Sequence, residues 1–184
     1  MGNIYPRTVP GSPHHSLWKE KPMVIEHIGL HPNFIKNIAQ WQFDQWKDLT
    51  GFQTREGYIA FLEKCLESTT IPYVLIAHSE GKLLGSVNLV ACDMAIRSEL
   101  TPWLAQLFVL SEQRGKGIGT ALVYAAVEQM RFQKFEKLYL FTSGTLPRYY
   151  ERLGFKVREQ VNYLGKERTV MEYSLDLSNR KYCN

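Results

Sequence analysis

The sequence predicts a mixed α/β domain in which a central sheet carries helices on both faces. Short apolar runs of strand length alternate with longer segments whose apolar residues recur every three or four positions. The predicted order is β-α-α-β-β-β-α-β-α-β-β, which mixes direct strand-to-strand connections with helical ones. Apolar residues make up 45% of the 184 positions, so a single folded core is expected.

The first part of the chain predicts one strand and two helices. Residues 23–28 have the apolar character of a strand, and Pro32 suits the first turn of a helix. Thr54 is a good N-cap for a second helix, which we expect to end near Ser68. The link at residues 48–53 separates the two helices and is a candidate for a loop that gates substrate entry.

The middle of the chain predicts a hairpin, a loop and a further strand. Residues 72–77 and 83–91 have strand character, and the turn between them contains Gly81. A loop at residues 93–102 leads to an apolar run at residues 104–110, which predicts a buried strand.

A glycine-rich loop follows this strand and precedes a long helix. Gly115, Gly117 and Gly119 let the backbone approach a ligand without obstruction by a Cβ atom. The start of the helix presents unpaired N–H groups and the positive end of the helix dipole. The loop and helix therefore predict a site for a phosphate or pyrophosphate. The glycine spacing fits neither the dinucleotide-binding fingerprint nor the Walker loop.

The last part of the chain predicts a strand, a short helix and a hairpin. Residues 137–142 form a clear strand, and a short helix begins at Pro147 and ends at Gly154. Residues 155–177 predict a hairpin whose connection spans residues 162–168.

Two motifs give the chain a resemblance to the GCN5-related N-acetyltransferases (GNAT). The motif Arg114-x-x-Gly117-x-Gly119 is similar to the loop that grips the pyrophosphate of acetyl-CoA in that family. The motif Tyr150-x-x-x-Gly154-Phe155 is similar to a second family element near the chain end. The resemblance covers about residues 23–177 and implies the GNAT fold, whose central sheet is mixed and mostly antiparallel, with helices on both faces.

We therefore expect a flexible N-terminal arm at residues 1–21, a GNAT domain at residues 22–178 and a tail at residues 179–184. The sequence contains no apolar run long enough for a transmembrane helix and no secretory signal pattern. Three scattered cysteines suit a reducing compartment, and a cytoplasmic location is expected.

The resemblance implies an N-acetyltransferase that takes acetyl-CoA as cosubstrate and moves the acetyl group to a primary amine by direct attack. An uncharged amine must attack the carbonyl, the oxyanion needs a hydrogen bond, and the leaving thiolate benefits from a proton. No covalent nucleophile is required, which agrees with our interpretation of Cys65 and Cys92 as structural. No metal is expected.

The resemblance also assigns the contacts to acetyl-CoA. Backbone N–H groups of the glycine-rich loop bind the pyrophosphate, and the strand before the loop holds the pantetheine arm. The residues at these positions are Leu107, Phe108, Val109, Arg114, Gly115, Lys116, Gly117, Ile118, Gly119 and Thr120. Ser143 stands where the family often has an asparagine that holds the pantetheine, so a hydroxyl replaces an amide there.

Tyr150 occupies the family's tyrosine position and is the expected general acid. A phenol with a reference pKa of about 10 can protonate a thiolate whose conjugate acid has a pKa of about 8.5. We expect its neighbour Tyr149 to pack within the fold. No general base stands out. The candidates by location are Glu26, His78, Asp93 and Glu99, and water is an alternative.

The acceptor is open between small-molecule and protein amines. In the resembling family the first two helices frame the acceptor, so Trp41, Phe43 and Trp46 either line that site or belong to the core and its rim. The alternative function is a non-catalytic CoA-binding module that acts as a sensor or scaffold. A net charge of +4 does not favour a nucleic-acid partner, no membrane is expected, and the protein is expected to be a monomer or a homodimer.

Overall fold

The computed structural model describes residues 22–175, so the predicted N-terminal arm and tail lie outside the described residues. Its strands are β1 (Val24–His27), β2 (Tyr73–Ser79), β3 (Lys82–Val90), β4 (Trp103–Val109), β5 (Lys137–Thr142), β6 (Lys156–Tyr163) and β7 (Lys166–Ser174). They form one sheet in the order β1-β2-β3-β4-β5-β7-β6. Only β4 and β5 pair in parallel among these strands, which confirms the prediction of a mostly antiparallel sheet.

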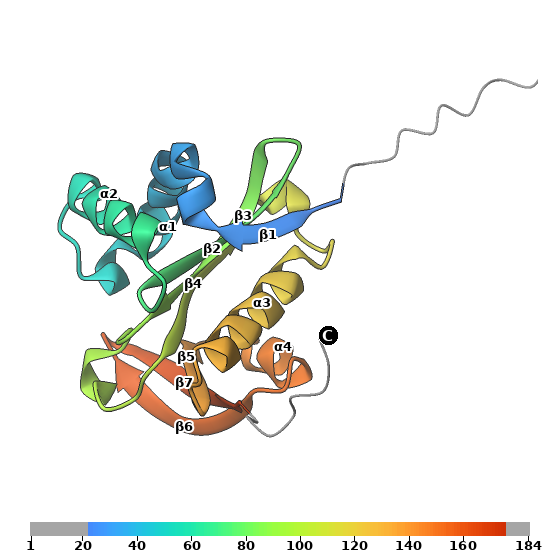
Figure 1. Ribbon diagram of the computed structural model, residues 1–184. Coiled ribbons are helices and arrows are strands. Elements are labelled where there is room, and N and C mark those ends of the chain that lie inside the picture. Colours follow the sequence, from blue (N-terminus) through green and yellow to red (C-terminus); the bar gives the residue numbers. More distant parts are fainter. Residues whose placement is uncertain (1–21, 176–184) are drawn as a thin grey trace, which may run out of the picture.

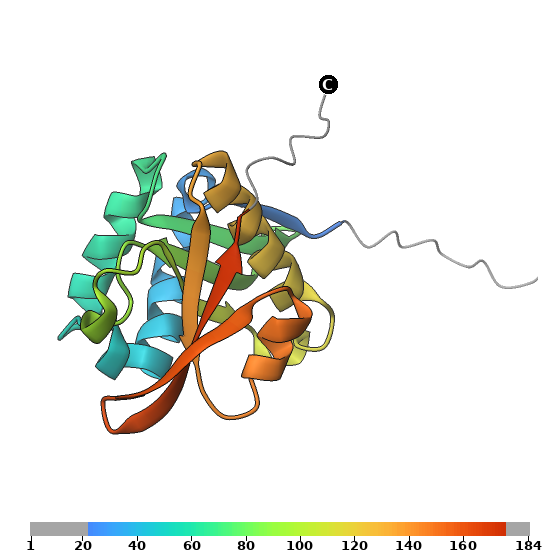
Figure 2. The same cartoon turned by 90° about the horizontal axis from the view of Figure 1, so that it is seen from below.

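Helices cover both faces of this sheet, as predicted. They are α1 (Ile35–Thr50), α2 (Arg55–Lys64), α3 (Ile118–Phe132) and α4 (Pro147–Arg152). Figures 1 and 2 show α1 and α2 on one side of the strands and α3 and α4 on the other. Within residues 22–175, no helix combines the length and the apolar composition that crossing a bilayer requires.

The alternation of side chains along β2 explains why both faces are covered. Val74 and Ile76 pack into a cluster with α1 and α2, whereas Leu75 and Ala77 pack into a cluster with α3. All four side chains are buried, because successive residues of a strand point to opposite faces of the sheet.

The sheet opens between β4 and β5, where the pairing is minimal. Trp103 and Tyr139 are the one residue pair that joins these parallel strands. A bulge also bends β4, because Gln106 has φ of 46° and three steps along β4 match two along β3. The edge of β4 beyond Trp103 is therefore left without a partner strand on the β5 side.

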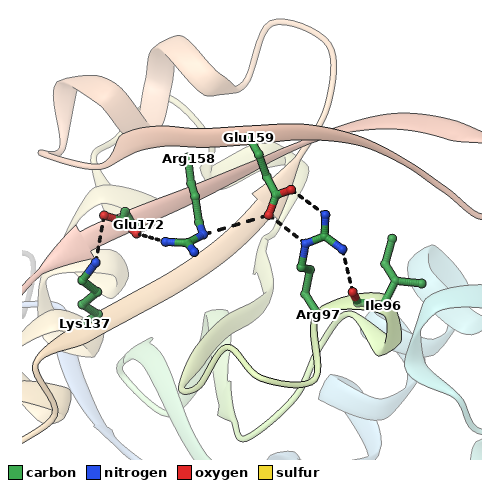
Figure 3. A network of polar contacts seen from close by, with 6 residues as sticks. All are labelled: Ile96, Arg97, Lys137, Arg158, Glu159 and Glu172. Atoms are coloured by element: carbon green, nitrogen blue, oxygen red, sulfur yellow. Dashed lines mark hydrogen bonds and ion pairs between the residues drawn. The ribbon is translucent and has the colours of Figure 1, made fainter.

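The loop between β3 and β4 is anchored to the distant strand β6 (Figure 3). Arg97 in this loop pairs with Glu159 of β6 through two N–O contacts of 2.8 and 2.5 Å. Arg158 donates to Glu172 of β7 at 2.8 Å, and Lys137 of β5 donates to the same carboxylate at 3.1 Å. Together these contacts form a charged network across β6, β7 and β5.

The link between α1 and α2 is shorter than the sequence predicted. Helix α1 continues to Thr50, and Gly51 ends it with φ of 74°. A residue without a Cβ atom adopts this left-handed conformation at little cost, which makes glycine a common helix terminator. The predicted gating link at residues 48–53 is therefore wrong in its first half, which is helical.

The hairpin of β6 and β7 is also tighter than predicted. Its strands pair up to Tyr163 and Lys166, so the connection is two residues rather than residues 162–168. Leu164 and Gly165 have φ of 51° and 73°, and two consecutive positive φ values suit the twist of a two-residue hairpin turn. The non-glycine residue at the first of these positions gave no signal for this turn.

Candidate active site

A cavity of about 710 Å³ lies where β4 and β5 separate. It is lined by predicted site residues from β4, the glycine-rich loop, α3, β5 and α4. These are Leu107, Phe108, Val109, Arg114, Gly115, Gly117, Ile118, Gly119, Thr120, Ser143 and Tyr150. Lys116 is the exception, since it is exposed and its Nζ donates to Gln113 Oε1 at 3.0 Å. The volume is in the range that ligand sites of proteins commonly have.

The glycine-rich loop leaves its backbone open to this cavity. Gly115 and Gly117 have φ of 78° and 80°, a region that residues with side chains rarely adopt. A Cβ atom at either position would have no other atom within 4 Å. The two glycines are therefore required by the loop conformation, and the space beside them is free for a ligand.

The loop ends at the start of α3, where backbone N–H groups are left without helical partners. Ala121 N donates the first intrahelical bond, to Gly117 O at 3.0 Å. The N–H groups of Ile118, Gly119 and Thr120 come before it and have no helical carbonyl to accept them. These groups and the positive end of the helix dipole favour a phosphate at this end of the cavity.

Tyr150 places a phenol in the wall of the same cavity. Its ring packs edge-on against Tyr149 and Phe155, with centroid distances of 5.0 and 5.8 Å. Burial, with a smaller effect from Tyr149, raises the pKa of Tyr150 above its usual value. The phenol therefore keeps its proton at neutral pH and can act as a proton donor.

Tyr149 lies in the cavity wall as well, which corrects the prediction that it only packs within the fold. Its hydroxyl lies 3.4 Å from Thr120 Oγ1 in the first turn of α3. A Cβ atom at Gly119 would come within 3.1 Å of the same hydroxyl. Tyr149 thus connects α4 to the first turn of α3, and the absence of a side chain at Gly119 leaves room for this contact.

Arg168 of β7 is a cavity residue that the sequence did not reveal. Its Nη1 donates to Ser143 Oγ at 3.4 Å, and its guanidinium lies 5.7 Å from the centre of the Phe141 ring. Arg168 Nε is buried and has no hydrogen-bond partner among the described residues. No motif predicted Arg168, because it meets Ser143 through the pairing of β5 with β7.

The aromatic residues of α1 were expected either to line the acceptor site or to belong to the core and its rim, and they do not all lie in the same place. Trp46 lines the cavity, at a point where α1 is kinked by its φ of −133°. Trp41 stacks on Phe108 of β4 with a centroid distance of 5.0 Å, and Phe43 packs beside Tyr58 in the cluster around α2. Only Trp46 of the three is thus in a position to meet a ligand in this cavity.

A buried polar network connects α1 and α2 to the bulge of β4. Tyr58 Oη donates to Gln42 Oε1 at 2.6 Å, and Gln42 Nε2 donates to the Gln106 carbonyl at 3.1 Å. Asn88 of β3 donates to the side-chain oxygens of both Gln42 and Gln106, at 3.0 and 3.2 Å. Gln42 lies in the apolar stripe of α1, and a polar residue there is the one sequence signal for this network.

Asp93 is where this network reaches the cavity. Gln106 Nε2 donates to Asp93 Oδ1 at 3.2 Å. Asp93 lines both the large cavity and a smaller one of about 350 Å³. It is the one acidic residue that lines either of these two cavities in the described part of the chain. Burial raises the pKa of the Asp93 carboxyl to about 7, although the bond from Gln106 opposes this effect.

The other candidates for a general base lie elsewhere. Glu26 and His78 are hydrogen-bonded to each other at the β1 edge of the sheet, and Glu99 is exposed in the loop before β4. None of the three lines either cavity. Of the four predicted candidates, only Asp93 therefore lies in the cavity wall.

The described cysteines differ from one another. Cys65 is buried, and burial raises the pKa of its thiol to about 11, which keeps it protonated and unreactive. Cys92 is exposed and lines the smaller cavity, and its Sγ donates to Met94 O at 3.6 Å, so its structural role stays a prediction. Neither thiol lines the large cavity.

The comparisons with known proteins agree with this geometry. The model of the acetyltransferase (GNAT) family matches residues 35–155. The comparison with curated proteins found no match to the chain. Solved structures with the same fold include a GNAT-family acetyltransferase from Streptococcus pneumoniae, with a TM-score of 0.63 and 19% sequence identity over 84% of this chain and 99% of that one.

Two further structures with this fold are N-acetyltransferases of small amines. An aminoglycoside 6'-N-acetyltransferase complexed with coenzyme A has a TM-score of 0.63 and 16% identity over 83% of this chain and 97% of that one. The spermidine/spermine N-acetyltransferase SpeG from Vibrio cholerae, in mutant forms, has a TM-score of 0.64 and 15% identity over 88% of this chain and 100% of that one. At these identities the likeness establishes the fold.

Proposed function

The chain belongs to the acetyltransferase (GNAT) family, and from this premise we propose that it is an N-acetyltransferase that moves an acetyl group from acetyl-CoA to a primary amine. One observation carries the proposal. A single cavity joins an anion-binding helix start, an unpaired strand edge and a protonated tyrosine. These three features suit the parts of acetyl-CoA. The helix start would bind the pyrophosphate, the strand edge would bond the amides of the pantetheine arm, and the tyrosine would protonate the leaving thiolate.

The residues of the cavity fit acetyl-CoA as the donor substrate. The N–H groups at the start of α3 would hold its pyrophosphate. The edge of β4 that lies beyond Trp103 has no partner on the β5 side, so its backbone groups would bond the amides of the pantetheine arm. When bound, the thioester supplies an activated acetyl group.

Two side chains of the cavity would move the protons of the reaction. Asp93 accepts a proton from the attacking amine, and Tyr150 donates a proton to the sulfur as the bond between carbon and sulfur breaks. The pKa of about 7 at Asp93 suits a base at neutral pH, because much of the carboxyl is ionised there. The raised pKa of Tyr150 keeps the donor protonated.

The smaller cavity favours a particular class of acceptor. Its walls include Phe52, Tyr58 and Phe61, and Asp93 is its one acidic residue among those described. Spermidine and aminoglycosides, named for two of the similar structures, carry several amines. A single carboxyl would pair with one, so a monoamine on an apolar or aromatic body fits this cavity better.

Calorimetric titration with acetyl-CoA tests the donor site. We expect micromolar binding by the natural chain and loss of binding in Gly117→Glu, which places a carboxylate where the pyrophosphate would lie. Gly165→Glu is the matched control, because Gly165 has a similar φ of 73° and an equally open Cβ position but does not line the cavity. Equal binding by Gly117→Glu would overturn the assignment of the loop.

Thiol release from acetyl-CoA tests the transfer itself. We expect it with aromatic or aliphatic monoamines and less of it with spermidine. Binding of acetyl-CoA without thiol release for any amine class would contradict the enzymatic proposal. It would favour instead a module that senses acetyl-CoA or acts as a scaffold.

A further inference from the structure

Three side chains converge at the β1 edge of the sheet, away from both cavities. They are Glu26 of β1, His78 of β2 and His31 in the segment that leads into α1. Glu26 Oε2 lies 2.7 Å from His31 Nε2 and 3.0 Å from His78 Nε2. The three ligand atoms all lie within 4.8 Å of one another.

The surroundings hold these groups in place while leaving them open to solvent. Phe34 stacks on the His31 ring with a centroid distance of 5.6 Å and lies 6.3 Å from the His78 ring. The side chains of Glu26, His31 and His78 are 34%, 26% and 14% exposed, so an ion and its water molecules can reach them.

We propose that Glu26, His31 and His78 form a binding site for a divalent transition metal ion such as Zn²⁺. Two imidazole nitrogens and one carboxylate oxygen, with a further position left for water, are a common donor set for zinc. The donor atoms of a tetrahedral zinc site lie about 3.3 Å apart. The distances from Glu26 Oε2 to the Nε2 atoms of His31 and His78, 2.7 and 3.0 Å, therefore need to lengthen only slightly.

The same geometry limits the affinity of the site. When an imidazole binds metal through Nε2, its Nδ1 carries the proton and needs an acceptor. His78 Nδ1 is buried and has no hydrogen-bond partner among the described residues. We therefore expect micromolar rather than nanomolar binding.

The metal would connect the edge strand β1 to the segment that precedes α1. Glu26 and His78 lie on paired strands, and His31 comes from outside the sheet. A bound ion should therefore stabilise the folded chain, because it binds the folded state alone. This effect is independent of acetyl transfer, since none of the three ligands lines either cavity.

Zinc titration into the full chain tests the proposal. We expect one Zn²⁺ per chain at micromolar affinity and a rise in the thermal midpoint of unfolding on addition of zinc. His31→Ala should weaken binding by at least roughly tenfold and remove the rise in the midpoint. Glu26→Gln should do the same while preserving the volume of the side chain. Mg²⁺ prefers oxygen ligands and should not compete.

The matched control is the double variant His14→Ala/His15→Ala, which removes two other histidines of the chain. It should bind zinc as the natural chain does. Absence of zinc binding by the natural chain, or undiminished binding by both His31→Ala and Glu26→Gln, would overturn the proposal. Circular dichroism establishes that each variant is folded before it is titrated.

Discussion

Burial raises the pKa of two titratable side chains in the cavity wall, Tyr150 and Asp93, with opposite chemical results. Burial keeps Tyr150 protonated throughout the neutral range, so it is suited to donate a proton. It brings the pKa of Asp93 from an acidic value to about 7, so this carboxyl can both release and accept a proton near neutrality. One physical cause thus prepares a donor and an acceptor of protons in one cavity.

Replacement of Tyr150 by phenylalanine tests the proton donor. The ring keeps its packing against Tyr149 and Phe155, but the acidic hydroxyl is lost. We expect kcat to fall by about 100-fold, while the affinity for acetyl-CoA measured by calorimetry stays the same. Tyr124→Phe is the control, because Tyr124 is exposed on α3 and does not line the cavity, and it should keep full turnover. Unchanged turnover of Tyr150→Phe at every pH would exclude Tyr150 as the acid.

Replacement of Asp93 by asparagine tests the proton acceptor. In the natural chain, kcat/KM should rise as the pH passes through about 7, because the carboxyl loses its proton there. The variant should be slower, and this rise in its pH profile should disappear. A variant that keeps both the rate and the rise would show that water or another group takes the proton.

The pH dependence of the free energy of unfolding should reveal the raised pKa of Asp93 without any measurement of activity. Asp93 has a folded-state pKa of about 7, whereas an unfolded aspartate has one of about 3.9. Its contribution to stability is therefore present below pH 4 and is lost as the pH rises through about 7. Denaturant unfolding of the natural chain should give a lower free energy of unfolding at pH 8 than at pH 5. This difference should be smaller in Asp93→Asn.

At the scale of elements, local sequence signals were sufficient for most of the fold. Periodicity located the strands and helices, and the glycine spacing located the loop that lines one end of the cavity. The bulge at Gln106 could not be predicted, because a non-glycine residue with φ of 46° carries no local signal. The bulge is accompanied by a bond from Gln42 to the Gln106 carbonyl, and that pairing depends on the packing of α1 against the sheet.

The buried network of α1 gives a prediction about stability. Gln42→Leu would remove the acceptor of the Tyr58 hydroxyl and the donor to the Gln106 carbonyl, although Asn88 would keep its bonds to Tyr58 and Gln106. We expect a loss of about 2–3 kcal/mol in the free energy of unfolding, measured with urea, because buried polar groups lose their hydrogen bonds. Gln40→Leu in the same helix, whose side chain bonds to Asp44 at the surface, should change stability by less than about 0.5 kcal/mol. Equal effects of the two substitutions would show that the network contributes no particular stability.

At the scale of the whole molecule, the cavity is assembled by the topology of the sheet. The parallel pair of β4 and β5 stops after Trp103 and Tyr139, and residues from both strands line the opening. Arg168 and Asp93 come from segments with no motif, which is why the sequence missed the first and left the second among several candidates. Sequence motifs located the cavity wall formed by the glycine-rich loop and Tyr150, whereas long-range packing determined the rest of the wall.

The loop that carries Asp93 is held by a contact with a distant strand. Arg97 pairs with Glu159 of β6 (Figure 3). In the same loop, Ala95 N donates to Tyr163 Oη at 3.3 Å. The side chains of Arg97 and Glu159 are 27% and 29% exposed, so their pairing should contribute at most about 1 kcal/mol to stability. The contact can still matter for activity, because it restrains the segment from which Asp93 reaches the cavity.

The variant Arg97→Ala therefore tests whether the contact with Glu159 positions Asp93 or mainly stabilises the fold. We expect kcat/KM to fall several-fold, with the pH dependence assigned to Asp93 weakened, while the free energy of unfolding changes by no more than about 1 kcal/mol. Arg97→Lys should restore part of the activity, because it keeps one charged contact with Glu159. Arg131→Ala removes a comparable surface ion pair with Glu128 on α3 and should leave turnover unchanged. If both alanine variants lost stability equally and kept full activity, the contact with β6 would have no role in placing Asp93. The loop would then hold its shape through its buried apolar contacts, which include Met94, Leu100 and Trp103.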